Sequence, residues 1–247
     1  MATPASILRR IPLAVQPKQA LFIDGIRYAS DIIEVGYARL RQSLTEIALA
    51  PPDSDQLAAL SPAVFLDAWA VVDAVDRFRM LYQQMPGIRS SEPELGKQTL
   101  AEVAAPFRDL RNVADHLAQR ADFVVARGGA ALGALSWVTC FQVKPAIVWF
   151  CVLRPGTIRV QPEFRKEPLV TVLDWPTDRI CLAAGGFEAN LSAIRPHIKR
   201  RIEHFQDQLE REFNRLGIAD TPAASDVFMR QAYQMAPGQF PWQDDDA

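Results

Sequence analysis

The chain has 247 residues, of which 49% are hydrophobic and 23% are charged, the composition of a globular protein with a sizeable core. Its formal net charge is −2 at pH 7, and its isoelectric point is near 6.0. These values exclude broad, nonspecific binding to a phosphate backbone, which needs a strongly basic face. Any contact with nucleic acid is therefore expected to be local.

The cysteines and the hydropathy pattern point to a cytoplasmic protein. Cys140, Cys151 and Cys181 lie in apolar runs without CxxC spacing, so we expect reduced thiols rather than a zinc site or disulfides. No stretch approaches the roughly 20 uninterrupted apolar residues that span a bilayer. The N-terminus also has no apolar run followed by a small-residue cleavage site. We therefore expect no membrane partner.

Residues 17–127 are predicted to form three helices of a bundle. The first helix, running to the "PPDSD" stop, has an apolar face at helical spacing. The second is predicted to start with Ser61 as N-cap and Pro62 at its first position, and to end at Pro86. The expected core residues of these two helices are Leu21, Ile26, Ile33, Tyr37, Leu40, Leu44, Ile47, Phe65, Trp69, Val72, Phe78, Leu81 and Met85.

The third helix is predicted to start near Pro93 or Lys97 and to continue through a near-continuous heptad stripe. Pro106 lies inside this pattern, so it should kink the helix or mark its true start. The residues of the stripe are Val103, Phe107, Leu110, Ala114, Leu117, Ala121 and Val124.

The residue pattern changes after the third helix. Residues 131–184 carry short runs rich in β-branched and aromatic side chains, which predict an inserted antiparallel β-meander. Residues 186–217 are predicted to form the final bundle helix, and 218–247 a mobile C-terminal tail. The apolar stripe of this helix is expected to consist of Leu191, Ile194, Ile198, Ile202, Phe205, Leu209, Phe213 and Leu216. The expected fold is thus α+β and mainly α: a four-helix bundle with a β-meander inserted between helices three and four.

The stretch "FRDLRNVADHLAQR" (107–120) of the third helix carries the most suggestive polar residues. Arg111 is followed by Asn112, and His116 comes after four intervening residues. On a regular helix Arg111 and His116 lie about 140° apart, so they do not share a face. They act on one phosphate only if a groove or a second copy of the helix brings them together, which predicts a homodimer.

This pattern resembles the R-x4-6-H motif of the HEPN superfamily of helical-bundle ribonucleases and nucleotide-binding proteins. The layout of the helices at about 19–126 and 187–216 is also similar to that family, and the sheet lies outside its common core. The resemblance implies a metal-independent endoribonuclease without a cofactor, of the kind that acts as a toxin or defence effector with an antitoxin or another protein partner. Cleavage would use the RNA's own 2′-hydroxyl, so DNA would be a poor substrate.

The resemblance also assigns roles to individual residues. His116 would act as general acid or base and Arg111 would stabilise charge on the phosphate, while Asn112 would orient the imidazole or bind substrate. Further substrate contacts are predicted for Arg108 and Asp115 beside the motif. The basic run of the last helix would guide the RNA backbone through Arg200 and Arg201.

Three other interpretations of these residues remain open. Arg111 with Asp115, and Asn112 with His116, are ordinary i,i+4 pairs of a helix surface. The bundle is alternatively a non-catalytic RNA-, nucleotide- or protein-binding module. A third possibility is an interaction scaffold, in which the sheet docks a partner through Trp137, Trp149 and Trp175.

Overall fold

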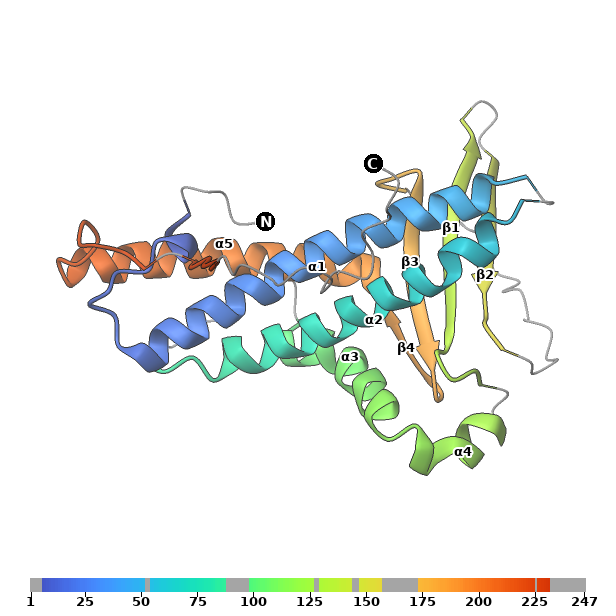
Figure 1. The fold of residues 1–247 in the computed structure, drawn as a ribbon, viewed down its shortest axis with the longest axis horizontal. Coiled ribbons are helices and arrows are strands. Elements are labelled where there is room, and N and C mark those ends of the chain that lie inside the picture. The colour runs from blue at the N-terminus through green and yellow to red at the C-terminus, as the bar shows by residue number, and fades with distance from the viewer. Residues whose placement is uncertain are drawn as a thin grey trace, which may run out of the picture.

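The computed structural model describes residues 6–51, 54–87, 98–126, 129–143, 147–156, 173–224 and 226–231. The protein is α+β. In chain order, an antiparallel sheet follows the third long helix and precedes the last one, as predicted (Figure 1). The elements are η1 (Ile7–Arg9), α1 (Pro17–Leu49), α2 (Gln56–Gln83), α3 (Leu100–Asp115), η2 (Ala118–Arg120), α4 (Ala121–Ala126), β1 (Ala134–Gln142), β2 (Ile147–Leu153), β3 (Thr177–Ala184), β4 (Phe187–Asn190) and α5 (Leu191–Arg215).

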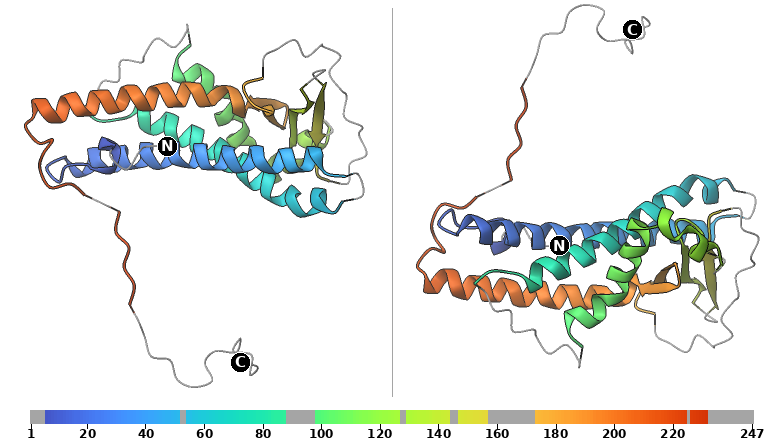
Figure 2. Two further views of the ribbon diagram at one scale, coloured as in Figure 1. Left: turned by 90° about the horizontal axis from the view of Figure 1, so that it is seen from above. Right: turned by 90° about the horizontal axis from the view of Figure 1, so that it is seen from below.

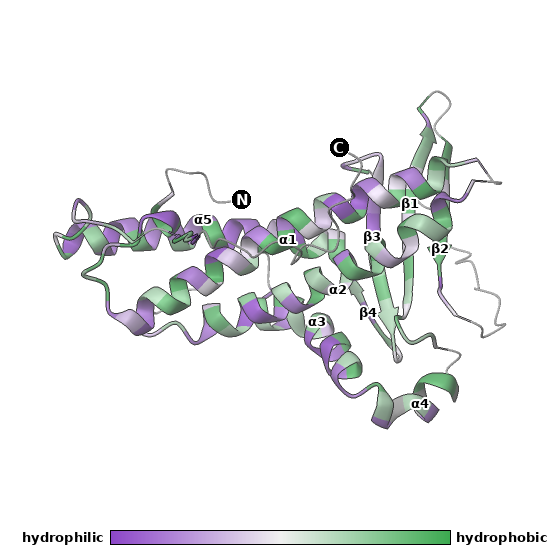
Figure 3. Ribbon diagram, in the orientation of Figure 1, coloured by the Kyte–Doolittle hydropathy of each residue, from purple (hydrophilic) through white to green (hydrophobic). Residues whose placement is uncertain are grey.

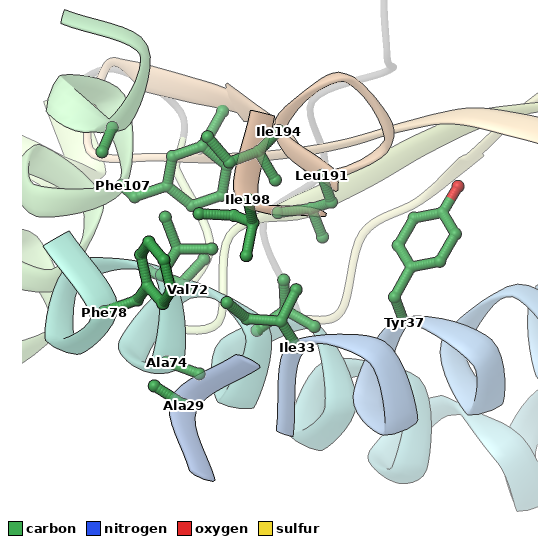
Figure 4. Close-up of a cluster of buried hydrophobic side chains, with 14 of the residues drawn as sticks. Ala29, Ile33, Tyr37, Val72, Ala74, Phe78, Phe107, Leu191, Ile194 and Ile198 are labelled. Carbon is green, nitrogen blue, oxygen red and sulfur yellow. The ribbon is translucent and has the colours of Figure 1, made fainter. Parts of the chain in front are cut away.

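The core lies where α1, α2, α3 and α5 meet on one side of the sheet. α1 packs along α2 and runs beside α5, and the sheet stands at one end of these helices (Figure 2). Hydrophobic and hydrophilic residues alternate along α1 and α5, as expected for helices with one buried face (Figure 3). Figure 4 shows side chains from all four helices in one cluster, which includes Ile33, Val72, Phe78, Phe107 and Ile198.

Most of the predicted core residues of these helices are buried, with a few exceptions. Leu21 is 68% exposed and Leu216, at the end of the last helix's stripe, is 52% exposed. Trp69 and Leu81 are half-buried. The seven preceding stripe residues of α5 are all buried, namely Leu191, Ile194, Ile198, Ile202, Phe205, Leu209 and Phe213.

The predicted start of the second helix was wrong. α2 begins at Gln56, so Ser61 and Pro62 lie inside the helix rather than at its N-terminus. The Ser61 hydroxyl donates a hydrogen bond to the carbonyl of Leu57, one turn back. This is the bond that serine makes inside a helix, in competition with its capping role. Proline lacks a backbone N–H, so Pro62 leaves one carbonyl of the preceding turn without its helical donor.

α3 starts later and ends earlier than predicted. Thr99 is its N-cap, so neither Pro93 nor Lys97 marks the start, and Pro106 lies inside the helix. The helix stops at Asp115, and His116 is its C-cap with non-helical backbone angles. Of the stripe beyond Val113, Ala114 and Ala121 are exposed. Alanine buries little apolar surface, so packing of these two residues would contribute little to the stability of a longer helix.

The start of α3 is a capping box. The Thr99 hydroxyl accepts from the backbone N–H of Glu102, and the Glu102 carboxylate accepts from the backbone N–H of Thr99 at 2.8 Å. We expect Thr99→Ala to lower the free energy of unfolding by about 1 kcal/mol, the usual cost of losing such a cap. Thr99→Ser keeps the acceptor and should cost much less. Equal losses in the two variants, measured by urea denaturation, would contradict a capping role.

The sheet is antiparallel but not a meander. Its strand order is β2-β1-β3-β4, so β1 is central and lies between β2 and β3. Trp137 and Val138 of β1 are consecutive and point to opposite faces, yet both are buried, as suits a central strand. Short connections join β1 to β2 and β3 to β4, whereas the long connection from β2 to β3 carries the chain across to the other edge of β1. The part of the predicted meander at 157–172 lies outside the described residues.

The end of α1 is attached to the sheet through three threonine hydroxyls. Thr45 Oγ1 of α1 lies 2.7 Å from Thr177 Oγ1 of β3, which lies 2.9 Å from Thr139 Oγ1 of β1. Thr139 and Thr177 are fully buried, so these polar atoms satisfy one another instead of water. The chain of hydroxyls fixes where α1 crosses the start of β3.

The first part of the predicted mobile tail is attached to the body of the protein. Ala223 forms a β-bridge with Pro12, and the Asp226 carboxylate accepts two hydrogen bonds from the Arg27 guanidinium, at 2.7 and 3.1 Å. The Arg27 side chain is only 3% exposed, and this pairing raises its pKa. A buried charge needs such a partner, and the Arg27–Asp226 pair therefore fixes the tail as far as Asp226.

Among the described residues, α2 is the one helix whose length and hydropathy would suffice to cross a bilayer. Its buried residues, including Phe65, Val72 and Phe78, pack into the core that α1, α3 and α5 share. The core helix of a folded domain gives the same signal.

Candidate ligand-binding cleft

Arg111, the first residue of the predicted catalytic pair, is held by carboxylates. Its guanidinium donates to Asp76 of α2 at 3.0 Å, and it lies 3.4 Å from Asp73 and 3.9 Å from Asp115. The hydrogen bond to Asp76 raises the pKa of Arg111. Its side chain is still 32% exposed, but its charge is neutralised by these carboxylates, two of which also pair with Arg77 and Arg79.

His116 and Asn112 lie on the protein surface near the end of α3. His116 Nδ1 lies 2.7 Å from the side-chain oxygen of Gln119, which only accepts hydrogen bonds. In the neutral tautomer that suits this contact, the ring proton is on Nδ1 and Nε2 is the acceptor. Both His116 and Asn112 are exposed. Arg111 thus pairs with α2, whereas His116 pairs with the turn that follows α3.

The predicted substrate-binding residues are scattered. Arg108 is exposed and pairs with the neighbouring Asp109 at 3.1 Å, and Asp115 is exposed beside Arg111. Arg200 is exposed on α5, but Arg201 is completely buried and donates to the carbonyls of His197 and Gln98. Arg201 therefore does not lie on the basic surface that the sequence suggested, because its position falls on the apolar face of α5.

The three tryptophans of the predicted docking surface do not share one face. Trp137 is 2% exposed and belongs to the core, so it is not available to a partner. Trp149 is exposed and stacks on Phe141, with ring centroids 4.5 Å apart. Trp175 is exposed in the segment before β3, under the guanidinium of Arg41, which lies 4.2 Å from the ring centroid.

A cleft with a volume of about 890 Å³ lies between α1, α5 and the start of β3. This volume is in the range of small-molecule sites. None of the predicted catalytic or substrate-binding residues lines it, although Trp175 of the predicted docking surface does. Its lining combines charged, polar and aromatic side chains: Glu34 and Tyr37 from α1, Asp174, Trp175, Asp178 and Arg179 around the start of β3, and Asn190, Ser192, Arg195, Lys199 and Glu203 around and along α5.

A β-bulge places Arg179 at this cleft. The pairing of β1 and β3 shifts register between Ser136 and Val138, so Arg179 and Ile180 together face the single residue Trp137. Arg179 has a φ of 55°, a left-handed conformation that usually requires glycine. Such strain in a bulge commonly marks a functional position, because a bulge changes where a side chain points.

The bulge is built from specific hydrogen bonds. The Asp178 carboxylate accepts from the backbone N–H groups of Asp174 (3.2 Å) and Arg179 (2.7 Å). The backbone N–H of Ile180 donates to Ser192 Oγ in the first turn of α5, at 2.9 Å. The buried carboxylate and the serine therefore hold Arg179 in its strained conformation and fix the start of α5 beside it.

The wall of the cleft on α1 is also rigid. The Tyr37 hydroxyl lies 2.8 Å from Ser192 Oγ, and burial of its ring raises the pKa of Tyr37. Arg195 donates to Glu34 at 2.7 Å, and its guanidinium lies 4.3 Å from the centroid of the Tyr37 ring. Glu34 and Arg195 thus neutralise each other.

Few of the charged side chains that line the cleft are free to bind a ligand. In the part of the chain that the structure describes, no carboxylate pairs with the Arg179 side chain. Lys199 is 74% exposed and lies 3.9 Å from Glu203, which is a loose pair. The N-terminus of α5, capped by Asn190, adds the partial positive charge of a 25-residue helix. Asp174 and Trp175 are exposed at the mouth of the cleft.

No protein-family model, no curated protein and no solved structure matches this chain.

Sequence reasoning missed the cleft because its parts are distant in sequence. Glu34 and Arg195 are separated by 161 positions, and nothing around Arg179 signals a bulge or a positive φ. The i,i+4 pairs of the helix surface were visible, in contrast: Asp73 and Arg77 pair at 2.9 Å as that spacing indicates. The spacing of Thr99 and Glu102, three residues apart, is also a local sequence signal for a capping box.

Proposed function

We propose that this protein is a non-catalytic nucleotide-binding module and that the cleft between α1, α5 and β3 is its binding site. The observation that carries the proposal is Arg179, a strained arginine without a carboxylate partner among the described residues, held at the wall of a cleft of about 890 Å³. A fold maintains such strain only where the surrounding structure compensates for it, and it is most often found at functional sites.

The chemistry of the lining suits the three parts of a nucleotide. Arg179 and the N-terminus of α5 offer positive charge for a phosphate. Asp174 is a carboxylate of the kind that accepts hydrogen bonds from ribose hydroxyls. The Trp175 ring, which is 48% exposed and has the Arg41 guanidinium over one face, offers its other face to a base. The free cysteines agree with a reducing, cytoplasmic location, which we also propose.

The test is the variant Arg179→Gly. Glycine accepts a φ of 55° without strain, so we expect the free energy of unfolding to rise by roughly 0.5–1 kcal/mol. Nucleotide affinity should fall at least about tenfold, because the charged side chain is gone. Both are measurable on one sample, by urea denaturation and by isothermal titration with adenosine and guanosine mono-, di- and triphosphates.

Arg215→Ala is the matched control, because Arg215 is an exposed arginine at the other end of α5, paired with Glu212. It should leave nucleotide binding unchanged. Wild-type protein that binds none of these nucleotides below about 1 mM would overturn the proposal, since that is the weak end of specific binding. Equal affinities of wild type and Arg179→Gly would overturn the assignment of Arg179.

Metal-independent cleavage of RNA by Arg111 and His116 is the second candidate function. It is favoured by the exposure of His116 and by the contact of its Nδ1 with Gln119, which leaves Nε2 for a substrate. It requires Arg111 to leave Asp73 and Asp76 when RNA binds. The carboxylate contacts of Arg111 are the reason why we place this candidate second.

An RNA cleavage assay in EDTA separates the two candidates. We expect no cleavage by the wild-type protein if it is only a binding module. Cleavage that His116→Ala abolishes would instead support the ribonuclease. His116 is the better residue to change, because Arg111→Ala also removes a partner of the buried Asp76 and so disturbs the packing of α3 on α2.

A further inference from the structure

α1 has a second apolar face that the described part of the chain leaves largely exposed, apart from the contacts of Arg27 and Asp226 with Tyr28. Leu21, Tyr28, Ile32 and Val35 are 68, 48, 44 and 43% exposed, and we call these four residues the outer stripe. At 100° per residue they fall within about 60° of one another on the helix surface. The buried residues of α1, such as Ile33 and Tyr37, lie on the opposite side of the helix.

An exposed apolar face of this kind usually marks an interface. Single exposed apolar residues are common on any protein surface, but four in register along one helix are the pattern of a helix that packs on both sides. Val227, Phe228 and Met229 are 78–86% exposed, so these residues of the C-terminal segment do not cover the stripe.

We propose that the outer stripe is the contact surface of a homodimer, in which α1 packs antiparallel on α1 of a second copy. The charges beside the stripe support this partner and this direction. Asp24 and Arg39 flank the stripe, and the midpoint between them falls beside Ile32. A two-fold axis there places Asp24 of each copy near Arg39 of the other, whereas a parallel pair places like charges together.

Both charged residues are available for such a contact. Asp24 is 50% exposed and lies 3.4 Å from Arg27, and Arg39 is 60% exposed and lies 3.1 Å from Asp67. Each therefore has exposed surface beyond its contact within the chain. This inference does not depend on nucleotide binding, because the outer stripe and the lining of the cleft share no residue.

The test measures molecular mass by light scattering at concentrations from about 1 to about 100 µM, the range of weak to moderate dimers. We expect the wild type to dimerise and Ile32→Glu to raise the dissociation constant at least about tenfold. Val35→Glu should do the same. Leu66→Glu is the control, because Leu66 is 65% exposed on α2, outside the stripe.

Cysteine crosslinking tests the direction of the pair. Tyr28 and Val35 lie at equal distances from the proposed axis, so a mixture of Tyr28→Cys and Val35→Cys should crosslink more than either variant alone. The wild type, treated in the same way, shows the contribution of the three native thiols. Stronger crosslinking within each single variant would overturn the antiparallel arrangement.

Two results in the mass measurement would overturn the homodimer at this surface. The first is a wild-type dimer that Ile32→Glu and Leu66→Glu weaken equally, since the interface would then lie elsewhere. The second is a wild-type monomer at all concentrations. If the double variant Phe228→Ser, Met229→Ser then dimerises, the C-terminal segment rather than a second copy is the occupant of the stripe.

Discussion

Gly133→Ala is expected to lower the free energy of unfolding by roughly 3 kcal/mol or more, through a backbone clash added to a strained dihedral angle. Gly133 precedes β1 and has a φ of 78°. A Cβ atom there would clash with the carbonyl oxygen of Ala183 and lie 2.9 Å from Cβ of Ala184, both on β3. Neither neighbour is a flexible side chain, so β1 and β3 would have to separate.

Gly217→Ala is the control for this variant. Gly217 has a similar φ of 67°, but a Cβ there meets nothing within 4 Å. The left-handed conformation alone costs about 1 kcal/mol for alanine. Urea denaturation of both variants therefore separates the dihedral strain from the clash. Equal losses would contradict the close approach of β1 and β3 at Gly133.

Trp137→Ala is the second variant with a large expected effect, a loss of about 3–5 kcal/mol. Trp137 is 2% exposed and contributes to the core on the helical side of β1. Removing the indole leaves a cavity that the rigid sheet fills only in part. Trp137→Phe should cost clearly less, because it keeps most of the buried area. It also removes an indole N–H that has no hydrogen-bond partner among the described residues.

Trp175→Ala is the matched control, since Trp175 is 48% exposed. We expect a loss within about 1 kcal/mol, which is typical of an exposed side chain. The two tryptophans thus have opposite roles, because Trp137 supports the fold and Trp175 is available to a ligand. Thermal or urea unfolding of both variants checks this assignment, and similar losses would contradict it.

Local signals in the sequence were reliable where a single element decides the outcome. The apolar stripe of α5 was predicted residue by residue from Leu191 to Phe213, and the sheet was expected between the right two helices. A helix of 25 residues with one apolar face has only one way to bury that face. The α+β class was therefore readable from the sequence.

Predictions that depended on neighbouring elements were less successful. Ser61 and Pro62 look like a helix start in the sequence, yet α2 continues upstream of them. Leu21 fits the core pattern of α1 but is exposed, because both sides of α1 carry apolar residues and the pattern does not say which side is covered. The prediction of a meander was wrong because the strand order, β2-β1-β3-β4, depends on how the long β2–β3 connection runs.

The sequence by itself determined the helical faces, the place of the sheet in the chain and the spacing of Arg111 and His116. Only the tertiary structure decided what those residues touch: Arg111 meets the carboxylates of α2, and His116 caps α3. The cleft also exists only in three dimensions, since Glu34, Arg179 and Arg195 come from separate elements. Hydrophobic periodicity is a property of one element, whereas charge pairing, bulges and clefts arise between elements that only the folded chain brings together.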